Sequence, residues 1–386
     1  MFSGGGPPAV GRLSSHAIAN REHTGPVDLR RLSRHVSRRL GVSHPESLVD
    51  GLRLIPLSQL TFVRHVHRGA LASTDEALLR DWRGEPVGSP ERDARTGALH
   101  VAVIKLRSAA YTVRAICMFV REQEVLMRLQ CDYIMGRYGL GVGRPEREAR
   151  WPSLFAVAEL ATDGSLRDAL EAQAEDPLTH VYGLDEALDW AIDVAGALSF
   201  LHSPGVGIIH RDLRSANVLL VRDPRTEALT AKLAGFKLYR TADGTPTLCD
   251  DLADDEWRRG LAPDAFLYRA PEAEDDADAI GPQPPADVFS LGAVMHEMFM
   301  RRSLAGALAA QGGWSREQYE EQFAAGFRVP LADRLPKELR LLIQSCLEWD
   351  PADRPTAGQV LRVLHTVRAG GAILHADKLV PHCGVM

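Results

Sequence analysis

The sequence predicts an α+β protein in which a smaller, strand-rich part precedes a larger, helical part. Three observations lead to this class. Segments with strand character lie in the first half of the 386 residues, such as Leu54 to Trp82 and Leu154 to Leu160. The clearest amphipathic helix pattern, Leu184 to Leu201, lies further along the chain. A polar turn within Ile209 to Leu220 then runs into an apolar strand.

Composition and charge fit a folded intracellular protein. An apolar fraction of 45% is sufficient for a sizeable core, and the net charge of −6 argues against a general nucleic-acid binder. The five cysteines show no paired spacing, which predicts a reduced cytoplasmic environment and no zinc site. No apolar run reaches the length of a transmembrane helix, and the N-terminus lacks a hydrophobic signal segment. The length is compatible with one large domain or two modest ones.

The polar turn holds a carboxylate and a carboxamide five residues apart, Asp212 and Asn217. An aspartate in such a turn can accept a proton from a hydroxyl, and an asparagine oxygen can bind a hard cation. The order His-Arg-Asp-Leu-x-x-x-Asn resembles the catalytic loop of eukaryotic protein kinases. The resemblance implies a bilobal fold, with a β-rich N-lobe and a larger α-helical C-lobe, that uses ATP and Mg²⁺. It also implies catalytic roles for Asp212, Arg214 and Asn217, with Asn217 as a metal ligand.

The segment that should hold the second metal ligand departs from the kinase pattern. A strand, Ala231 to Ala234, is followed by Gly235-Phe236-Lys237, where kinases carry Asp-Phe-Gly and the Asp binds magnesium. Ala265 stands where serine/threonine kinases carry a threonine. Two interpretations stay open: a pseudokinase that acts as a signalling switch or scaffold and binds ATP weakly with little dependence on Mg²⁺, or a weak but active kinase. Specificity for serine/threonine or tyrosine also stays open.

The glycine-rich turn that closes over the phosphates in kinases is poorly matched. Arg68 to Asp75 takes its place, and Gly69 is the only glycine in this stretch. Asp75 would bring a negative charge toward the phosphates.

A strand that ends in Lys105 resembles the Val-Ala-Ile-Lys strand of kinases. The resemblance implies that Lys105 binds the phosphates and that Val103, two residues earlier on the same strand face, lies against the adenine. A helical pattern from Ala115 to Leu129 follows. It offers Glu122 as the ion-pair partner of Lys105, and Glu124 is the alternative after a shift of two residues.

The segment Leu154 to Leu160 is expected to be a buried strand that leads into the hinge between the lobes. The resemblance places Ala158 at the gatekeeper position and adds Glu159 and Ala161 to the nucleotide-binding candidates. The following Gly164-Ser165-Leu166 resembles tyrosine kinases and the tyrosine-kinase-like group.

Two structural ties of the kinase C-lobe are also expected from the resemblance. Asp287, at the start of the central helix, would accept hydrogen bonds from backbone amides of the catalytic loop. Arg354 would pair with Glu272, the Glu of the Ala-Pro-Glu that ends the activation segment. These ties are present in the sequence although metal-binding chemistry is reduced.

The chain is expected to divide into a disordered N-terminal segment, a basic amphipathic helix with a linker, a protein-kinase-like domain and a C-terminal tail, at residues 1–25, 26–53, 54–368 and 369–386.

Two features outside the expected domain bear on partners and location. The helix at 28–40 carries arginines on one face, which predicts either a solvated face or a membrane- or partner-binding surface. Cys383 starts a C-terminal Cys-a-a-X pattern, which predicts farnesylation unless the pattern is a chance match. The expected partners are signalling proteins or protein substrates, without nucleic acid, and the expected location is cytoplasmic with membrane association through these two elements.

Overall fold

The computed structural model describes most of the chain from residue 53 to residue 370, namely residues 53–69, 72–82, 91–107, 113–143, 154–176, 181–242, 264–273, 283–310 and 312–370. The expected disordered segment at 1–25, the basic helix at 28–40 and the tail with Cys383 lie outside the described residues. None of the helices within the described ranges is both long enough and apolar enough to span a membrane.

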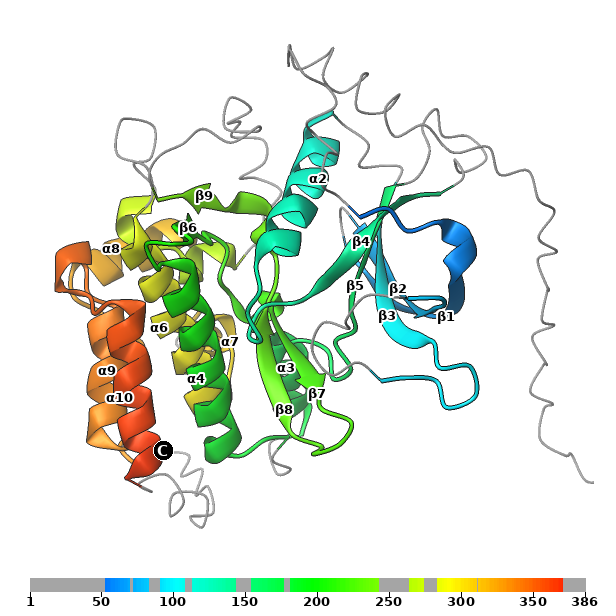
Figure 1. The fold of residues 1–386 in the computed structure, drawn as a ribbon. Coiled ribbons are helices and arrows are strands. Elements are labelled where there is room, and N and C mark those ends of the chain that lie inside the picture. The colour runs from blue at the N-terminus through cyan, green and yellow to red at the C-terminus, as the bar shows by residue number, and fades with distance from the viewer. Residues whose placement is uncertain are drawn as a thin grey trace, which may run out of the picture.

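The described residues form two lobes, with strands gathered at one end and helices at the other (Figure 1). The N-lobe holds a five-stranded antiparallel sheet of order β1-β2-β3-β5-β4, and helix α2 lies between this sheet and the helical lobe. The predicted α+β, bilobal kinase fold is therefore confirmed. The strands are β1 Leu60–Arg68, β2 Ala72–Leu79, β3 Leu99–Leu106, β4 Arg137–Val142, β5 Leu154–Glu159, β6 Ile208–Ile209, β7 Val218–Arg222, β8 Leu229–Leu233 and β9 Arg240–Thr241.

Helix α4 has the predicted bounds, and α2 begins two residues and ends one residue before the predicted 115–129. The α-helices are α2 Val113–Arg128, α3 Leu166–Glu175, α4 Leu184–Leu201, α6 Pro284–Met300, α7 Leu304–Ala309, α8 Arg316–Ala324, α9 Lys337–Cys346 and α10 Ala357–Ala369. Short 3-10 turns that matter below are η4 Ser215–Asn217, η5 Phe236–Leu238 and η7 Ala265–Tyr268.

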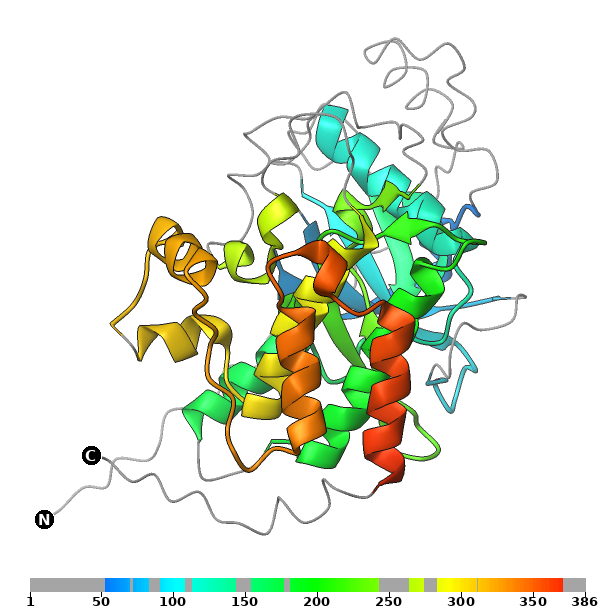
Figure 2. The ribbon, with the colours of Figure 1, turned by 90° about the vertical axis from the view of Figure 1, so that its left-hand side faces the viewer.

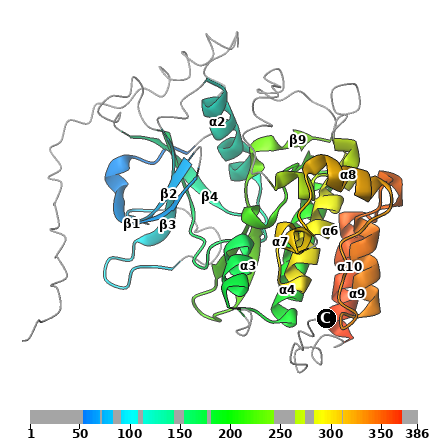
Figure 3. The same cartoon turned by 180° about the vertical axis from the view of Figure 1, so that it is seen from behind.

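The C-lobe is built around α6, which is buried on all sides from Ala286 to Phe299. A helix that is apolar all round has to be central, because every face needs cover from water. Helices α4, α9 and α10 pack together beside it, in green, orange and red in Figure 2. Seen from behind, α3 lies next to the β7–β8 hairpin (Figure 3).

The N-lobe sheet has two unlike faces. One face carries an apolar cluster that includes Val101, Val103, Val157 and Phe155 and is covered by the segment around Ile55. Among the described residues, this cluster contains no member of α2 or of the C-lobe. The other face receives α2, since Arg137 on β4 donates through Nε to Gln123 Oε1 on α2 at 2.8 Å. The first face is called the outer face below, and the second the α2 face.

Candidate catalytic and nucleotide site

The catalytic loop is held from below by the buried carboxylate of Asp287. Its Oδ2 accepts from the backbone N of His210 at 2.7 Å, and its Oδ1 accepts from the backbone N of Arg211 at 2.8 Å. Burial alone would raise the pKa of Asp287, but hydrogen bonds and charge from His202 and the loop outweigh it and lower the pKa. The carboxylate is therefore charged at neutral pH. The predicted capping role of Asp287 is confirmed.

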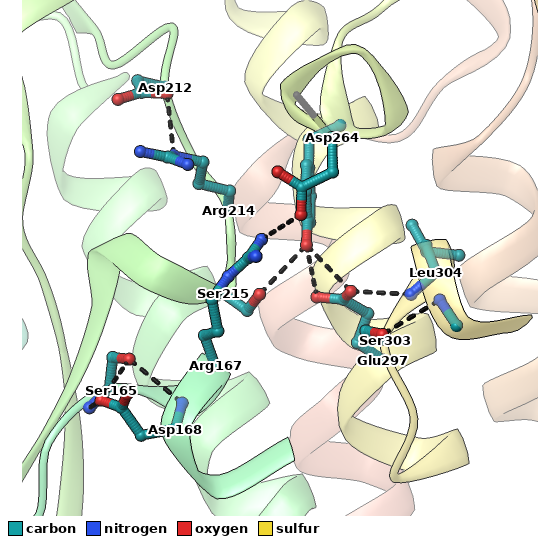
Figure 4. Close-up of polar contacts among 12 residues, drawn as sticks. Ser165, Arg167, Asp168, Asp212, Arg214, Ser215, Asp264, Glu297, Ser303 and Leu304 are labelled. Atoms are coloured by element: carbon teal, nitrogen blue, oxygen red, sulfur yellow. Dashed lines mark hydrogen bonds and ion pairs between the residues drawn. The ribbon is translucent and has the colours of Figure 1, made fainter. Parts of the chain in front are cut away.

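The three predicted catalytic residues lie together at the end of this loop. Asn217 Nδ2 donates to the backbone O of Asp212 at 2.6 Å and to its Oδ2 at 2.9 Å. Arg214 Nε lies 3.3 Å from Asp212 Oδ1, as Figure 4 shows. Both carboxylate oxygens of Asp212 thus face a donor of the same loop. The side-chain Oδ1 of Asn217 is the atom left to bind a cation.

Position 235 has no carboxylate, and its backbone favours glycine. Gly235 has φ +82°, in the left-handed region that side chains other than Gly, Asn or Asp rarely adopt. A Cβ at this position would lie 2.5 Å from Asn217 Cγ, so the Asn217 side chain fills the space that a larger residue would need. The Asn217 side chain therefore lies directly beside Gly235.

The loop offers fewer carboxylates than a kinase-type magnesium site carries, because position 235 is glycine. The ion needs carboxylate oxygens in addition to substrate phosphates. Here Gly235 offers none, and Asp212 already faces Asn217 and Arg214. No group of three or more His, Cys, Asp or Glu side chains able to hold a metal occurs among the described residues. No step is therefore assigned to a metal.

Phe236 keeps an inward position despite the changes on both sides of it. Its fully buried ring makes an edge contact with His210 at 4.6 Å between centroids. His210 in turn bonds the backbone O of Ala234 through Nε2 at 2.9 Å. Phe236 therefore packs as the Phe of a kinase Asp-Phe-Gly would, although the metal-binding Asp before it is replaced by Gly235.

The pairing of β3 places Lys105 on the outer face of the sheet. Val103 lies opposite Val157 of β5, and Lys105 lies opposite Phe155. Directly opposite residues of paired strands share a face, so Lys105 and Val103 lie on the side of the outer cluster. Ala158 lies opposite Ala102 and belongs to the α2 face. Val103 and Lys105 therefore lie on the opposite face of the sheet from Ala158.

Lys105 pairs with Asp75 instead of Glu122. Its Nζ lies 2.6 Å from Asp75 Oδ2 and 3.9 Å from the centroid of the Phe62 ring. His65 Nδ1 lies 2.8 Å from the other oxygen of Asp75. Asp75 lies within β2 and not in the expected glycine-loop turn, which is limited to the three residues between β1 and β2 that begin with Gly69. The expected ion pair between Lys105 and Glu122 is not formed.

The α2 face carries residues that the sequence had not pointed to. Strand alternation puts Ile104 on this face beside Ala102, where the resemblance had placed a lysine. Glu76 lies opposite Ala102. The Glu76 carboxylate is bonded by Arg64 Nε at 2.7 Å and lies 2.9 Å from His100 Nδ1. A charged cluster and an isoleucine therefore lie on the same face of the sheet as Ala102.

The signal for Ile104 was present but ambiguous. In the run Val101 to Lys105, a shift of one residue exchanges the two faces of the strand. The order of residue types cannot tell which of Ile104 and Lys105 faces α2. Only the register with β5 decides it.

Behind the hinge, four charged side chains are buried. Glu159 Oε1 accepts from Lys232 Nζ at 2.7 Å, and Glu159 Oε2 accepts from the backbone N of Gly136 at 3.2 Å. Glu122 and Arg137 complete the group, and each of the four residues is at most 9% exposed. Glu159 thus joins the hinge to β8 through its side chain. Ala161 packs nearby against a small apolar cluster of Met135, Val221 and Ala234, together with Leu219.

The substrate side of the catalytic loop contains a buried polar network. The Tyr268 hydroxyl contacts Ser215 Oγ at 3.0 Å and donates to the Glu297 carboxylate at 2.9 Å. Leu304 N donates to the same carboxylate at 2.8 Å. Burial raises the pKa of Glu297 to about 7. Arg167 on α3 forms an ion pair with Asp264 beside this network (Figure 4).

The end of the activation segment is tied to the C-lobe as predicted. Arg354 Nη1 lies 2.6 Å from Glu272 Oε1, and Arg354 Nη2 lies 2.8 Å from Glu272 Oε2. Two parallel bonds of this kind are stronger and more specific than one. Ala265, where a threonine was expected from the serine/threonine pattern, lies in η7 next to Asp264.

This combination of a two-lobed fold, a catalytic loop and a closed activation-segment end defines a protein kinase domain. Residues 61–364 match the family of protein tyrosine and serine/threonine kinases, and the chain therefore belongs to this family. Kinases of the family generally use ATP and Mg²⁺ and act on protein substrates.

Relatives of the chain carry serine/threonine kinase names. Two probable LIM domain-containing serine/threonine-protein kinases of Dictyostelium discoideum are each 27% identical over 279 residues, which is 70% of this chain and 25% and 37% of theirs. Serine/threonine-protein kinase 12 of Arabidopsis thaliana is 27% identical over 216 residues, which is 55% of this chain and 41% of the relative. The chain spans less than half the length of these curated relatives.

Proposed function

We propose that this chain is a pseudokinase of the tyrosine-kinase-like group that acts as a signalling scaffold or switch and not as a phosphotransferase. The observation that carries the proposal is the register of β3, which turns Lys105 to the outer face and Ile104 to the α2 face. Phosphoryl transfer depends on positioning and charge stabilisation at the phosphates. Position 104 carries isoleucine where a lysine would bind the phosphates, and position 235 carries glycine where a carboxylate would hold the metal. The group assignment rests on Gly164-Ser165-Leu166 after the hinge.

Nucleotide binding by such a domain is expected to be weak. We propose the hinge near Ala161 and the apolar cluster beside it, which includes Leu219 and Ala234, as the side on which an adenine binds. The phosphates meet no metal-binding carboxylate at position 235. We therefore expect ATP to bind with micromolar or poorer affinity and with little change when Mg²⁺ is replaced by a chelator.

One pair of measurements tests the proposal. Phosphate transfer from ATP to a generic protein substrate and to the chain itself is measured for wild type beside Asp212→Asn. ATP binding is measured by calorimetry with Mg²⁺ and with EDTA. We expect equal, background transfer for both proteins and equal, weak binding in both buffers. Transfer that depends on Asp212, or binding that requires Mg²⁺, would contradict the proposal.

The second candidate is an active serine/threonine kinase. The bonds from Asn217 to Asp212 favour it, since they hold a general base and a cation-binding oxygen side by side. The names of the relatives also favour it. The same assay separates the two candidates, because an active kinase loses transfer when Asp212 becomes Asn.

The proposed partners are other signalling proteins, bound through the surface of the domain and not through nucleic-acid contacts. We also propose attachment to a membrane surface at two points, a farnesyl group on Cys383 and the basic helix at 28–40. Both elements lie outside the described residues.

A further inference from the structure

We propose that Arg137 is the positioning residue that holds helix α2 against the sheet, in the place that a lysine of β3 would otherwise fill. The inference goes beyond the proposed function, because it concerns what fixes α2 whether or not the domain transfers phosphate.

The first support is where Arg137 lies. It is the first residue of β4 and lies directly opposite Ala158 of β5, on the α2 face of the sheet. Ala158 has a small side chain, which leaves room for a long neighbour across the strand pair. Ile104, on the same face, has no charge to offer α2. The guanidinium of Arg137 is thus a cation on the side of the sheet that α2 covers.

The second support is the set of bonds that Arg137 makes. Its Nε donates to Gln123 Oε1 on α2 at 2.8 Å. Its Nη1 donates to the backbone O of Gly136 at 3.2 Å and more weakly to that of Met135 at 3.4 Å. The side chain is therefore fixed at its own strand by two carbonyl groups and reaches α2 through Gln123.

The third support is charge balance. Glu122 lies next to Gln123 on α2 and is only 5% exposed. Burial lowers the pKa of Arg137, and the negative charges of Glu122 and Glu159 act in the opposite direction. A buried carboxylate without a nearby cation is strongly unfavourable. Lys105 is engaged by Asp75 on the outer face, so Arg137, which bonds Gln123 directly, is a buried cation of the α2 face that can offset the charge of Glu122.

The Glu159–Lys232 ion pair adds one further buried acid and one further buried base to Glu122 and Arg137. Two acids, Glu122 and Glu159, and two bases, Arg137 and Lys232, are buried together. No nucleotide or metal is needed to balance their charges. Helix α2 is consequently held in place by residues of the chain alone.

The experiment measures amide hydrogen exchange of α2 in the full chain without nucleotide. We compare Arg137→Leu, Arg137→Lys, Glu122→Gln and the double variant Arg137→Leu/Glu122→Gln with wild type. Arg128→Leu is the matched control, because Arg128 also bonds a side chain of α2, that of Glu124, but is largely exposed. Thermal unfolding of each protein reports whether the fold is kept.

We expect exchange in α2 to become roughly 100-fold faster in Arg137→Leu, because removing one partner leaves a buried charge behind. Arg137→Lys should restore most of the protection, since it keeps the charge. The double variant should exchange more slowly than Arg137→Leu, because the unpaired carboxylate is gone. Arg128→Leu should differ from wild type by no more than about twofold.

Two results would overturn the inference. One is unchanged exchange of α2 in Arg137→Leu. The other is equal exchange in Arg137→Leu and in the double variant, which would mean that Arg137 does not act on Glu122. If Arg137→Leu unfolds as a whole, the double variant still decides: a folded double variant supports the pairing, and one that unfolds equally contradicts it. Phosphate transfer is not part of the readout, so the outcome is independent of the proposed function.

Discussion

The catalytic loop and strand β3 belong to the same domain but differ in how closely they match the kinase pattern. In the loop, Asp212, Asn217 and the capping bonds of Asp287 have the arrangement that the kinase resemblance implied. In β3, the lysine lies on the outer face and Ile104 faces α2. The loop is fixed by buried bonds on which the C-lobe depends, whereas a residue on a strand face can change while the sheet stays paired. Buried structural bonds thus constrain the catalytic loop more tightly than strand pairing constrains which side chain of β3 faces α2.

The largest loss of stability is expected at the Arg354–Glu272 ion pair, which ties the end of the activation segment to the C-lobe. Arg354→Leu removes the partner of Glu272 and also the bonds of Arg354 to the backbone O of Glu348, Trp349 and Pro285. Arg354 is fully buried and Glu272 is 33% exposed, so the main cost is leaving these backbone acceptors without a donor, which should lower the free energy of unfolding by about 3–5 kcal/mol. Urea unfolding of the whole chain measures it.

Arg340→Leu is the control for that experiment, because its partner Asp333 is 97% exposed. A loss below about 1 kcal/mol is expected there. Similar losses for both variants would remove the distinction between structural ties and surface charges.

The next effect concerns pH and the network below the catalytic loop. The pKa of Glu297 is raised to about 7, chiefly by burial, so the folded chain holds this proton more tightly than the unfolded chain. Its contribution to stability is full below the unfolded pKa and is lost as pH rises toward about 7. Relative to Glu297→Gln, wild type should lose on the order of 3 kcal/mol across this range.

Unfolding in urea at several pH values between 4 and 8 tests this expectation. Glu320→Gln, on the exposed side of α8, is the control and should follow wild type. A wild type and a Glu297→Gln variant with parallel pH profiles would show that the network does not hold a proton.

A smaller loss of stability is expected at Gly235, which packs against Asn217 of the catalytic loop. Gly235→Asp should not restore phosphate transfer, and it should destabilise the chain by roughly 1–3 kcal/mol. The cause is the φ of +82° together with the 2.5 Å approach of a new Cβ to Asn217. Transfer assays and thermal unfolding are the measurements. A robustly active single variant would show that the lost carboxylate is the main lesion.

The smallest effect on stability is expected for the C-terminal tail, which belongs neither to the catalytic loop nor to β3. Cys383→Ser should leave thermal stability unchanged. It should shift the protein from the membrane fraction to the soluble fraction of a eukaryotic cell, because one of two weak anchors is lost. Intact mass of the wild type should show a farnesyl group on Cys383. Equal solubility of both proteins, without added lipid mass, would leave the tail without a role in attachment.

Local patterns predicted much of this protein. The bounds of α4 follow from its apolar periodicity, and the catalytic loop and the Arg354–Glu272 pair follow from motifs that each lie within a short stretch. Which face of the sheet a side chain points to cannot be read from a local motif. Whether Lys105 or Ile104 faces α2 depends on pairing with β5, about 50 residues away in sequence, and one residue of slip reverses the answer.

Partner choice among buried charges was also beyond the sequence. The sequence offered Lys105 as the partner of Glu122, and no motif pointed to Arg137. Asp75 decides the matter by holding Lys105 on the outer face. The charge on Arg137 becomes interpretable only when its position opposite Ala158 is known.

The packing of Asn217 against Gly235 couples these two positions to each other. A Cβ at position 235 would lie 2.5 Å from Asn217 Cγ, so a side chain introduced there obliges the asparagine side chain to shift. The same carboxamide donates to Asp212, so residue 235 influences the geometry of the catalytic loop although it carries no side chain of its own.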